Sequence, residues 1–188
     1  MKYSAALLLV LGVAAGAVDP YVSLKVSQPW DEGVQELYRV LPDLGVGVRF
    51  PRTSRVAIDL GLTGTYAAGV GEFSDMSLWD LAARFGAEFM VNRALGWYMT
   101  PGVLYMYAQE TAPYVDDEHN IITRTHGGGA IGFFGKSGLM LLREGDFHLN
   151  FEAGMDLVAV PTYRERIFEY TSTYWLPMFG FNLGLVAG

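Results

Sequence analysis

The sequence predicts an all-β fold, an eight-stranded antiparallel up-and-down barrel, and three observations support this prediction. Apolar residues recur at every second position over long stretches, as they do in strands, where successive side chains point to opposite faces. Eight such stretches are joined by links that alternate between short and long. The composition, with 51% hydrophobic residues, 14% aromatic residues and 23 glycines in 188 positions, excludes a disordered chain and disfavours a helical bundle.

The N-terminal segment is typical of a secretory signal peptide. A short n-region carries Lys2, an uncharged apolar run covers residues 4–16, and a small-x-small cleavage pattern ends at Ala17. The apolar run is shorter than the roughly 20 residues that a spanning helix needs. We therefore expect a leader at residues 1–17 and a single barrel domain at residues 18–188, with a retained N-terminal anchor as the alternative.

Charge and cysteine content exclude several classes of function. Thirteen basic residues against twenty acidic ones give a net charge of −7, so the chain lacks the basic face that a nucleic acid requires. Cysteine is absent, which excludes disulfides, thiolate metal sites and cysteine nucleophiles. An exported chain without cysteine is expected in a bacterial envelope rather than among small disulfide-rich secreted domains.

The first four predicted strands cover residues 21–29, 43–51, 54–68 and 77–91. Their apolar faces are formed by Val22, Leu24 and Val26; by Leu44, Val46, Val48 and Phe50; by Val56, Ile58, Leu60 and Leu62; and by Trp79, Leu81, Ala83, Phe85, Ala87, Phe89 and Val91. In the fourth stretch, Asp80, Arg84 and Glu88 occupy the opposite face. A helix would gather these three charges on one stripe but would scatter the apolar residues, so a strand explains the pattern better.

The last four predicted strands cover residues 95–109, 120–134, 146–160 and 173–187. The two clearest apolar faces are those of Phe147, Leu149, Phe151, Ala153, Met155 and Leu157, and of Trp175, Pro177, Phe179, Phe181, Leu183 and Leu185. The stretch at 95–109 alternates less cleanly, and the stretch at 120–134 contains three consecutive glycines from Gly127 to Gly129. We expect a bulge or bend there rather than a phosphate loop, because no Lys-Ser/Thr pair follows.

The predicted links place short turns at one end of the barrel. Short links are expected at residues 51–53 and 92–94, and long ones at 30–42, 69–76, 110–119 and 161–172. An even number of strands then puts both termini on the short-turn side. Residues 136–145 should form another short turn but include Leu139-Met140-Leu141-Leu142, so a one-turn helix or a different strand count is expected there.

Two orientations of these strands are consistent with the alternation. In a membrane barrel the apolar face points outward and the polar face fills the lumen, whereas a soluble lipocalin-like barrel lines a ligand pocket with its apolar face. Three features favour the membrane barrel: small residues on the polar face, bulky aromatic residues near the ends of the apolar face, and strands longer than the about 9–11 residues that cross a bilayer. A secreted soluble barrel that binds an apolar ligand remains the alternative.

Each of these features is carried by particular residues. The small residues of the polar face are Gly45, Gly47, Ala57, Gly61, Ala82, Gly86, Gly154, Gly180 and Gly184. The expected aromatic girdle consists of Trp79, Trp97, Tyr105, Tyr107, Phe147 and Trp175. Such residues prefer the level of the lipid headgroups, so they predict where the barrel meets the membrane surface.

The polar face predicts an ion-pair network inside the lumen. Its members are Lys25, Arg49, Asp59, Asp80, Arg84, Glu88, Glu152 and Asp156. Charges in a closed interior must be paired or hydrogen-bonded, and we hypothesise that Arg49 and Arg84 bridge the carboxylates. We expect the network to seal the lumen. The alternative is a very narrow pore, which would favour cations because five carboxylates face three cations.

An enzymatic role has little support in the sequence. The histidines are His119, His126 and His148, and none forms a recognisable catalytic arrangement with a serine or an aspartate. No catalytic residue, metal site or cofactor is expected, and a lipid-modifying enzyme that uses His148 is the remaining enzymatic alternative. The long links are the expected surface contacts, at Tyr114, Asp116, Asp117 and Glu118 and at Tyr163, Arg164 and Arg166.

The chain resembles the small eight-stranded outer-membrane β-barrel proteins of diderm bacteria. The leader, the alternating strand from Phe147 to Leu157 and the terminal strand from Phe179 to Leu185 carry the resemblance. Ser27-Gln28-Pro29 and the segment from Leu41 to Arg49 are similar to small uncharacterised chlamydia-type envelope barrels. The resemblance implies a monomer in the outer membrane, in contact with lipid, whose loops carry a structural, adhesion or interaction role, with a surface protein as a candidate partner.

One departure from that family concerns the C-terminus. The last residue of such barrels is commonly aromatic and helps the insertion machinery to recognise the terminal strand. This chain ends in Val186-Ala187-Gly188. Recognition would then depend on the apolar face formed by Phe179, Phe181 and other upstream residues.

Overall fold

The strands close into a barrel, as the alternation predicts. The structure, a computed structural model, describes residues 18–29, 38–71, 74–115, 118–141, 149–160, 164–166, 169–173 and 176–187. The barrel strands are β1 (Asp19–Pro29), β2 (Leu41–Pro51), β3 (Val56–Ala68), β4 (Ser77–Asn92), β5 (Trp97–Val115), β6 (Ile121–Leu141), β7 (Leu149–Val160) and β10 (Leu176–Ala187). The predicted leader at residues 1–17 lies outside the described residues.

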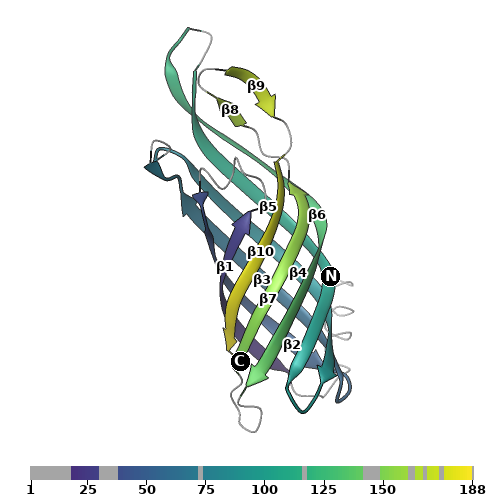
Figure 1. The fold of residues 1–188 in the computed structure, drawn as a ribbon. Coiled ribbons are helices and arrows are strands. Elements are labelled where there is room, and N and C mark those ends of the chain that lie inside the picture. The colour runs from purple at the N-terminus through teal and green to yellow at the C-terminus, as the bar shows by residue number, and fades with distance from the viewer. Residues whose placement is uncertain are drawn as a thin grey trace, which may run out of the picture.

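All neighbouring strands of the barrel are antiparallel, in the order β1-β10-β7-β6-β5-β4-β3-β2. The first and last strands close the cylinder, because β1 pairs with β2 on one side and with β10 on the other (Figure 1). The eight-stranded antiparallel barrel is therefore confirmed. Two further strands, β8 (Arg164–Arg166) and β9 (Glu169–Thr173), form a separate two-stranded sheet within the predicted link at 161–172.

The prediction is wrong for the segment after residue 134. Residues 135–141 continue β6 and pair with β5 and β7, so neither a one-turn helix nor another strand is present at these positions. Residues 142–145 of the expected turn lie outside the described residues. Lys136 and Gly138 point into the barrel, whereas Gly135 and Ser137 lie on the outer face. Small and polar residues on both faces hide the alternation, because the apolar signal of the outer face is interrupted.

Two other predictions about β5 and β6 need correction. The expected long loop at 110–119 is mostly strand, since β5 reaches Val115 and pairs there with Ile121. The glycines from Gly127 to Gly129 make no bulge, because the register with β5 is continuous through them. They leave room for tyrosines on the outer face: a Cβ atom at Gly129 would lie 2.2 Å from the Tyr105 hydroxyl oxygen.

The outer face of the barrel is apolar and the inner face is polar over much of its height. Phe85 and Phe151 are 54% and 51% exposed, whereas Glu152 on the adjacent position of β7 is 1% exposed. The described interior is thus lined by charged groups rather than by the apolar pocket of a soluble lipocalin-like barrel. No helix in the described part of the chain is long and apolar enough to cross a membrane.

Glycines on the inner face make room for large side chains from neighbouring strands. A Cβ atom at Gly47 would lie 2.4 Å from the Tyr21 ring, and one at Gly61 would lie 2.7 Å from the Tyr21 hydroxyl oxygen. Phe134 fills the corresponding space at Gly86, where a Cβ atom would lie 2.9 Å from its ring. An eight-stranded lumen is narrow, so each large residue requires small ones beside it.

Candidate functional site

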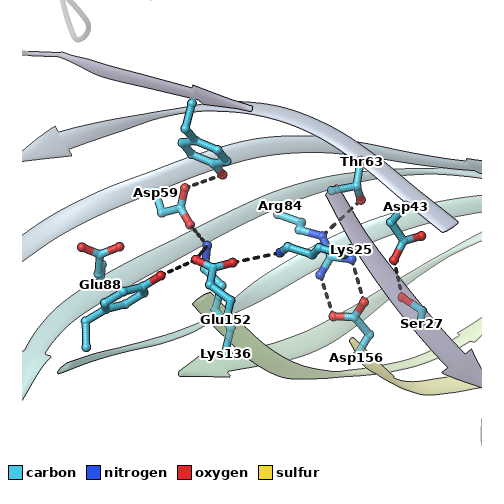
Figure 2. Close-up of polar contacts among 12 residues, drawn as sticks. Lys25, Ser27, Asp43, Asp59, Thr63, Arg84, Glu88, Lys136, Glu152 and Asp156 are labelled. Atoms are coloured by element: carbon cyan, nitrogen blue, oxygen red, sulfur yellow. Dashed lines mark hydrogen bonds and ion pairs between the residues drawn. The ribbon is translucent and has the colours of Figure 1, made fainter. Parts of the chain in front are cut away.

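Glu152 on β7 is the centre of a buried ion-pair cluster in the lumen. Lys25 Nζ lies 3.1 Å, Lys136 Nζ 3.2 Å and Arg49 Nη2 3.5 Å from its carboxylate oxygens. The Tyr98 hydroxyl donates a hydrogen bond of 2.6 Å to the same carboxylate. These partners come from β1, β6, β2 and β5, so the carboxylate connects distant parts of the barrel wall. Figure 2 shows Lys25 and Lys136 beside Glu152.

The cluster continues from Glu152 toward the short turns through two more carboxylates. Lys136 Nζ lies 2.6 Å from Asp59, which also accepts a hydrogen bond of 2.8 Å from the Tyr21 hydroxyl. Arg49 Nε lies 3.0 Å from Glu88, so Arg49 bridges Glu88 and Glu152. Each cation other than Lys25 thus contacts two carboxylates, which is the arrangement that buried charges need.

A second cluster lies around Arg84. Both terminal nitrogens of Arg84 donate hydrogen bonds of 2.6 Å to Asp156, a planar fork that is among the strongest ion-pair geometries. Its Nε donates a bond of 3.3 Å to the Thr63 hydroxyl (Figure 2). Nearby, Asp43 accepts hydrogen bonds from the hydroxyls of Ser27 and Thr65.

The structure brings together the residues that alternation placed on the inner face. Lys25, Arg49, Asp59, Asp80, Glu88, Glu152 and Asp156 are buried, and Arg84 is nearly so. Arg49 bridges two carboxylates, whereas Arg84 takes one carboxylate with both nitrogens.

Sequence reasoning missed four members of these clusters. The sequence predicts a turn at Lys136, and it does not distinguish Tyr21, Tyr98 and Asp43 as members of an ion-pair cluster. Tyr21 could have been found from its position, because it lies four residues before Lys25 on the same strand and therefore faces the same side.

Apolar side chains form a buried cluster at the end of the barrel where the long links lie. Tyr38, which precedes β2, is 3% exposed and donates a hydrogen bond of 2.9 Å to Glu110 on β5. It belongs to a buried cluster with Leu41, Met76 and Leu78. At the opposite end, a pocket of about 140 Å³ is lined by residues of the short turn between β2 and β3 and by Arg49.

Aromatic residues stand at two levels of the outer face. Trp79 and Tyr107 lie toward the long-link end, with ring centroids 5.5 Å apart. Trp97 begins β5 at the short-turn end, where its Nε1 donates a hydrogen bond of 2.8 Å to Ser137. Tyr105 is also exposed. Of the other predicted girdle residues, Phe147 and Trp175 lie outside the described residues.

The hairpin of β5 and β6 extends beyond the rest of the barrel wall at the long-link end (Figure 1). The ladder of β5 with β4 ends at Thr111, and the ladder of β6 with β7 begins at Phe133. Between residues 121 and 131, β6 therefore has a strand partner on one side only among the described strands. The separate hairpin β8–β9 lies at the same end, where β8 contacts β5.

The predicted surface residues fall in or near these two hairpins. Glu118 is exposed in the connection between β5 and β6, and Tyr114 belongs to β5. Arg164 and Arg166 are the ends of β8. The other three, Asp116, Asp117 and Tyr163, lie outside the described residues, as does His148.

Comparisons with known proteins concern the fold. No protein-family model matches the chain, and no curated protein matches it. The structure of Ail, the attachment invasion locus protein of Yersinia pestis, is similar with a TM-score of 0.55 and 10% sequence identity, over 93% of this chain and 98% of that one. The β domain of the Bordetella autotransporter BrkA is similar with a TM-score of 0.51 and 13% identity, over 90% of this chain and 70% of that one.

A third similar structure is Neisserial surface protein A, with a TM-score of 0.49 and 9% identity over 90% of this chain and 93% of that one. The first two likenesses show that the chain has the fold of small outer-membrane β-barrel proteins. The expected resemblance is thus confirmed at the level of the fold.

Proposed function

We propose that this protein, which has the fold of small outer-membrane β-barrels, is embedded in the bacterial outer membrane, has a sealed lumen and displays the β5–β6 hairpin as a protein-binding surface. The apolar outer face supports the membrane location. Outward-facing residues such as Leu44, Phe133 and Ile131 are 66%, 65% and 78% exposed, which is unfavourable in water and favourable in hydrocarbon.

The interior supports a sealed lumen rather than a pore. Ions that cross the barrel would have to separate the contacts of Glu152 with Lys25, Lys136 and Arg49. They would then meet the apolar cluster around Tyr38, which has few groups that could replace the water around an ion. These two barriers disfavour a function of the lumen as a conduit.

The observation that carries the proposed binding role is the one-sided ladder of β6 between residues 121 and 131. An extended segment of another protein can add as a further strand to the edge of a sheet, through backbone hydrogen bonds. Side chains there are exposed, including Ile121 at 70%. Ail is named as an attachment invasion locus protein, and a role in attachment is consistent with this hairpin.

The experiment is a selection of displayed peptides on the barrel reconstituted in lipid nanodiscs. We expect the selected peptides to alternate apolar and polar residues, because an added strand offers alternate side chains to the hairpin. A shortened variant replaces residues 112–124 by Asn-Gly between the paired residues Thr111 and Thr125, which suits a two-residue hairpin turn. This variant removes residues 121–124 of the edge and leaves residues 125–131, so binding of the selected peptides should be weaker than on the intact barrel but still detectable.

A matched control removes the other hairpin at the same end. Replacing residues 161–175 by a short linker deletes β8 and β9 but leaves the edge of β6. Peptide binding should then stay within twofold of that of the intact barrel. Equal binding to the intact and the shortened β5–β6 hairpin would contradict the proposed role.

A further inference from the structure

A groove crosses the outer face of the barrel over β1, β2 and β3. It has a volume of about 510 Å³, and its outward-facing lining includes Leu24, Pro42, Leu44, Gly64 and Tyr66. The lining is almost entirely apolar. Pro42 and Tyr66 stand near the long-link ends of their strands, so the groove lies in the half of the barrel nearer the long links.

The groove has its origin in the strand register. Leu24 pairs with Leu44, Leu44 pairs with Gly64, and Gly64 pairs with Leu81. These four outward-facing positions form one row across four strands, in which a glycine interrupts three leucines. Gly64 therefore leaves a gap one side chain deep between well-exposed leucines, and a hydrocarbon chain can fill that gap with van der Waals contact on both sides.

A cation lies close to the groove along the chain. Arg39 is exposed and precedes Pro42 by three residues, which span at most about 10 Å of chain. Its guanidinium is therefore within reach of the end of the groove that lies toward the long links. A guanidinium binds phosphate oxygens through two parallel hydrogen bonds, so apolar lining and phosphate recognition adjoin each other here.

We propose that this groove binds one phospholipid molecule, with an acyl chain lying over Gly64 and the phosphate group on Arg39. The inference rests on the membrane location proposed above and is independent of the β5–β6 hairpin. The occupant is a phospholipid, because its acyl chain fits the apolar groove and its phosphate group fits the cation. The site would hold one lipid at a fixed position, whereas lipids around the rest of the outer face exchange.

The experiment is native mass spectrometry of the detergent-released barrel titrated with dipalmitoyl phosphatidylglycerol. We expect one retained lipid per barrel. Gly64→Leu should lower lipid retention at least tenfold, because the new side chain fills the groove. The wall is not disturbed, since a Cβ atom at Gly64 meets only ordinary contacts, 3.5 Å from the Asp80 carbonyl oxygen and 3.8 Å from Leu81.

A matched control lies on the other side of the barrel. Gly135 is also an outward-facing glycine, and a Cβ atom there meets nothing within 4 Å. Gly135→Leu should leave lipid retention within twofold of that of the unmodified barrel. Equal retention by Gly64→Leu and Gly135→Leu would overturn the assignment of the groove.

The headgroup is tested separately with Arg39→Gln, which concerns an exposed residue and remains informative if Gly64→Leu fails to fold. Retention of phosphatidylglycerol should fall at least tenfold, whereas retention of dipalmitoyl glycerol, which has no phosphate, should not change. If Arg39→Gln retains both lipids as well as the unmodified barrel does, the proposed phosphate contact is wrong. If instead the folded barrel does not reconstitute into lipid bilayers at all, the membrane location itself is wrong, which separates that failure from a failure of the groove.

Discussion

Replacing Glu152 by glutamine tests whether the lumen is dry or hydrated. The carboxylate is fully buried and contacts Lys25, Lys136 and Arg49. Two of these cations keep a second carboxylate, since Lys136 remains 2.6 Å from Asp59 and Arg49 remains 3.0 Å from Glu88. Glu152 is the carboxylate that pairs with Lys25, so glutamine leaves Lys25 as a buried charge without its partner.

The expected loss follows from that one orphaned cation. Removing one partner of a buried ion pair costs about 3–5 kcal/mol, because the remaining charge stays out of water. Were the lumen filled with water, the pair would behave like an exposed one, and the same change would cost about 0–1 kcal/mol. The magnitude therefore distinguishes the sealed interior from an open one.

The assay is urea-induced unfolding in lipid vesicles, followed by tryptophan fluorescence. Trp79 and Trp97 stand at the two ends of the outer face, so their emission should shift when the barrel leaves the bilayer. Combining Glu152→Gln with Lys25→Met should recover part of the loss, because the orphaned charge is removed. Glu118→Gln, at an exposed position, should change the free energy of unfolding by less than about 0.5 kcal/mol. A loss below about 1 kcal/mol for Glu152→Gln would refute the sealed lumen.

Three further predictions concern the buried ring of Tyr38, the packing of the barrel wall at Gly61 and the lipid-facing residues of β4. Tyr38→Ala should raise the conductance of the barrel in planar bilayers and Tyr38→Phe should not, because the buried ring fills the long-link end of the lumen. An unchanged conductance in Tyr38→Ala would show that the ion pairs alone close the lumen. Gly61→Ala should lower the free energy of urea unfolding by about 1–3 kcal/mol, and by less in the Tyr21→Phe background, since the hydroxyl oxygen 2.7 Å from the new Cβ atom is then absent. Equal losses in both backgrounds would contradict this packing. Phe85→Arg, at the middle of β4, should lower the free energy of unfolding by about 2–4 kcal/mol in the same assay, and Val91→Arg, near the end of β4, by about 0–1 kcal/mol. Equal losses would place the membrane-embedded part of the outer face elsewhere.

The all-β fold and the direction in which each strand faces were predictable from sequence because they depend on local properties. Successive side chains of a strand point to opposite faces whatever the strand pairs with. Phe85 and Arg84 could therefore be assigned to opposite sides of β4 without knowledge of the other strands. The same reasoning failed after residue 134, where Gly135 and Ser137 replace apolar residues on the outer face of β6 and remove the signal.

What only the tertiary structure decided depends on register, which is not a local property. Which cation meets Glu152 is determined by how far each strand is shifted along its neighbours. Lys25 is brought to it from β1, and Lys136 from the adjacent strand β6. The groove at Gly64 likewise exists because three other strands place leucines beside that glycine. Alternation indicates the face on which a residue lies, but its height within the barrel follows from pairings between distant segments.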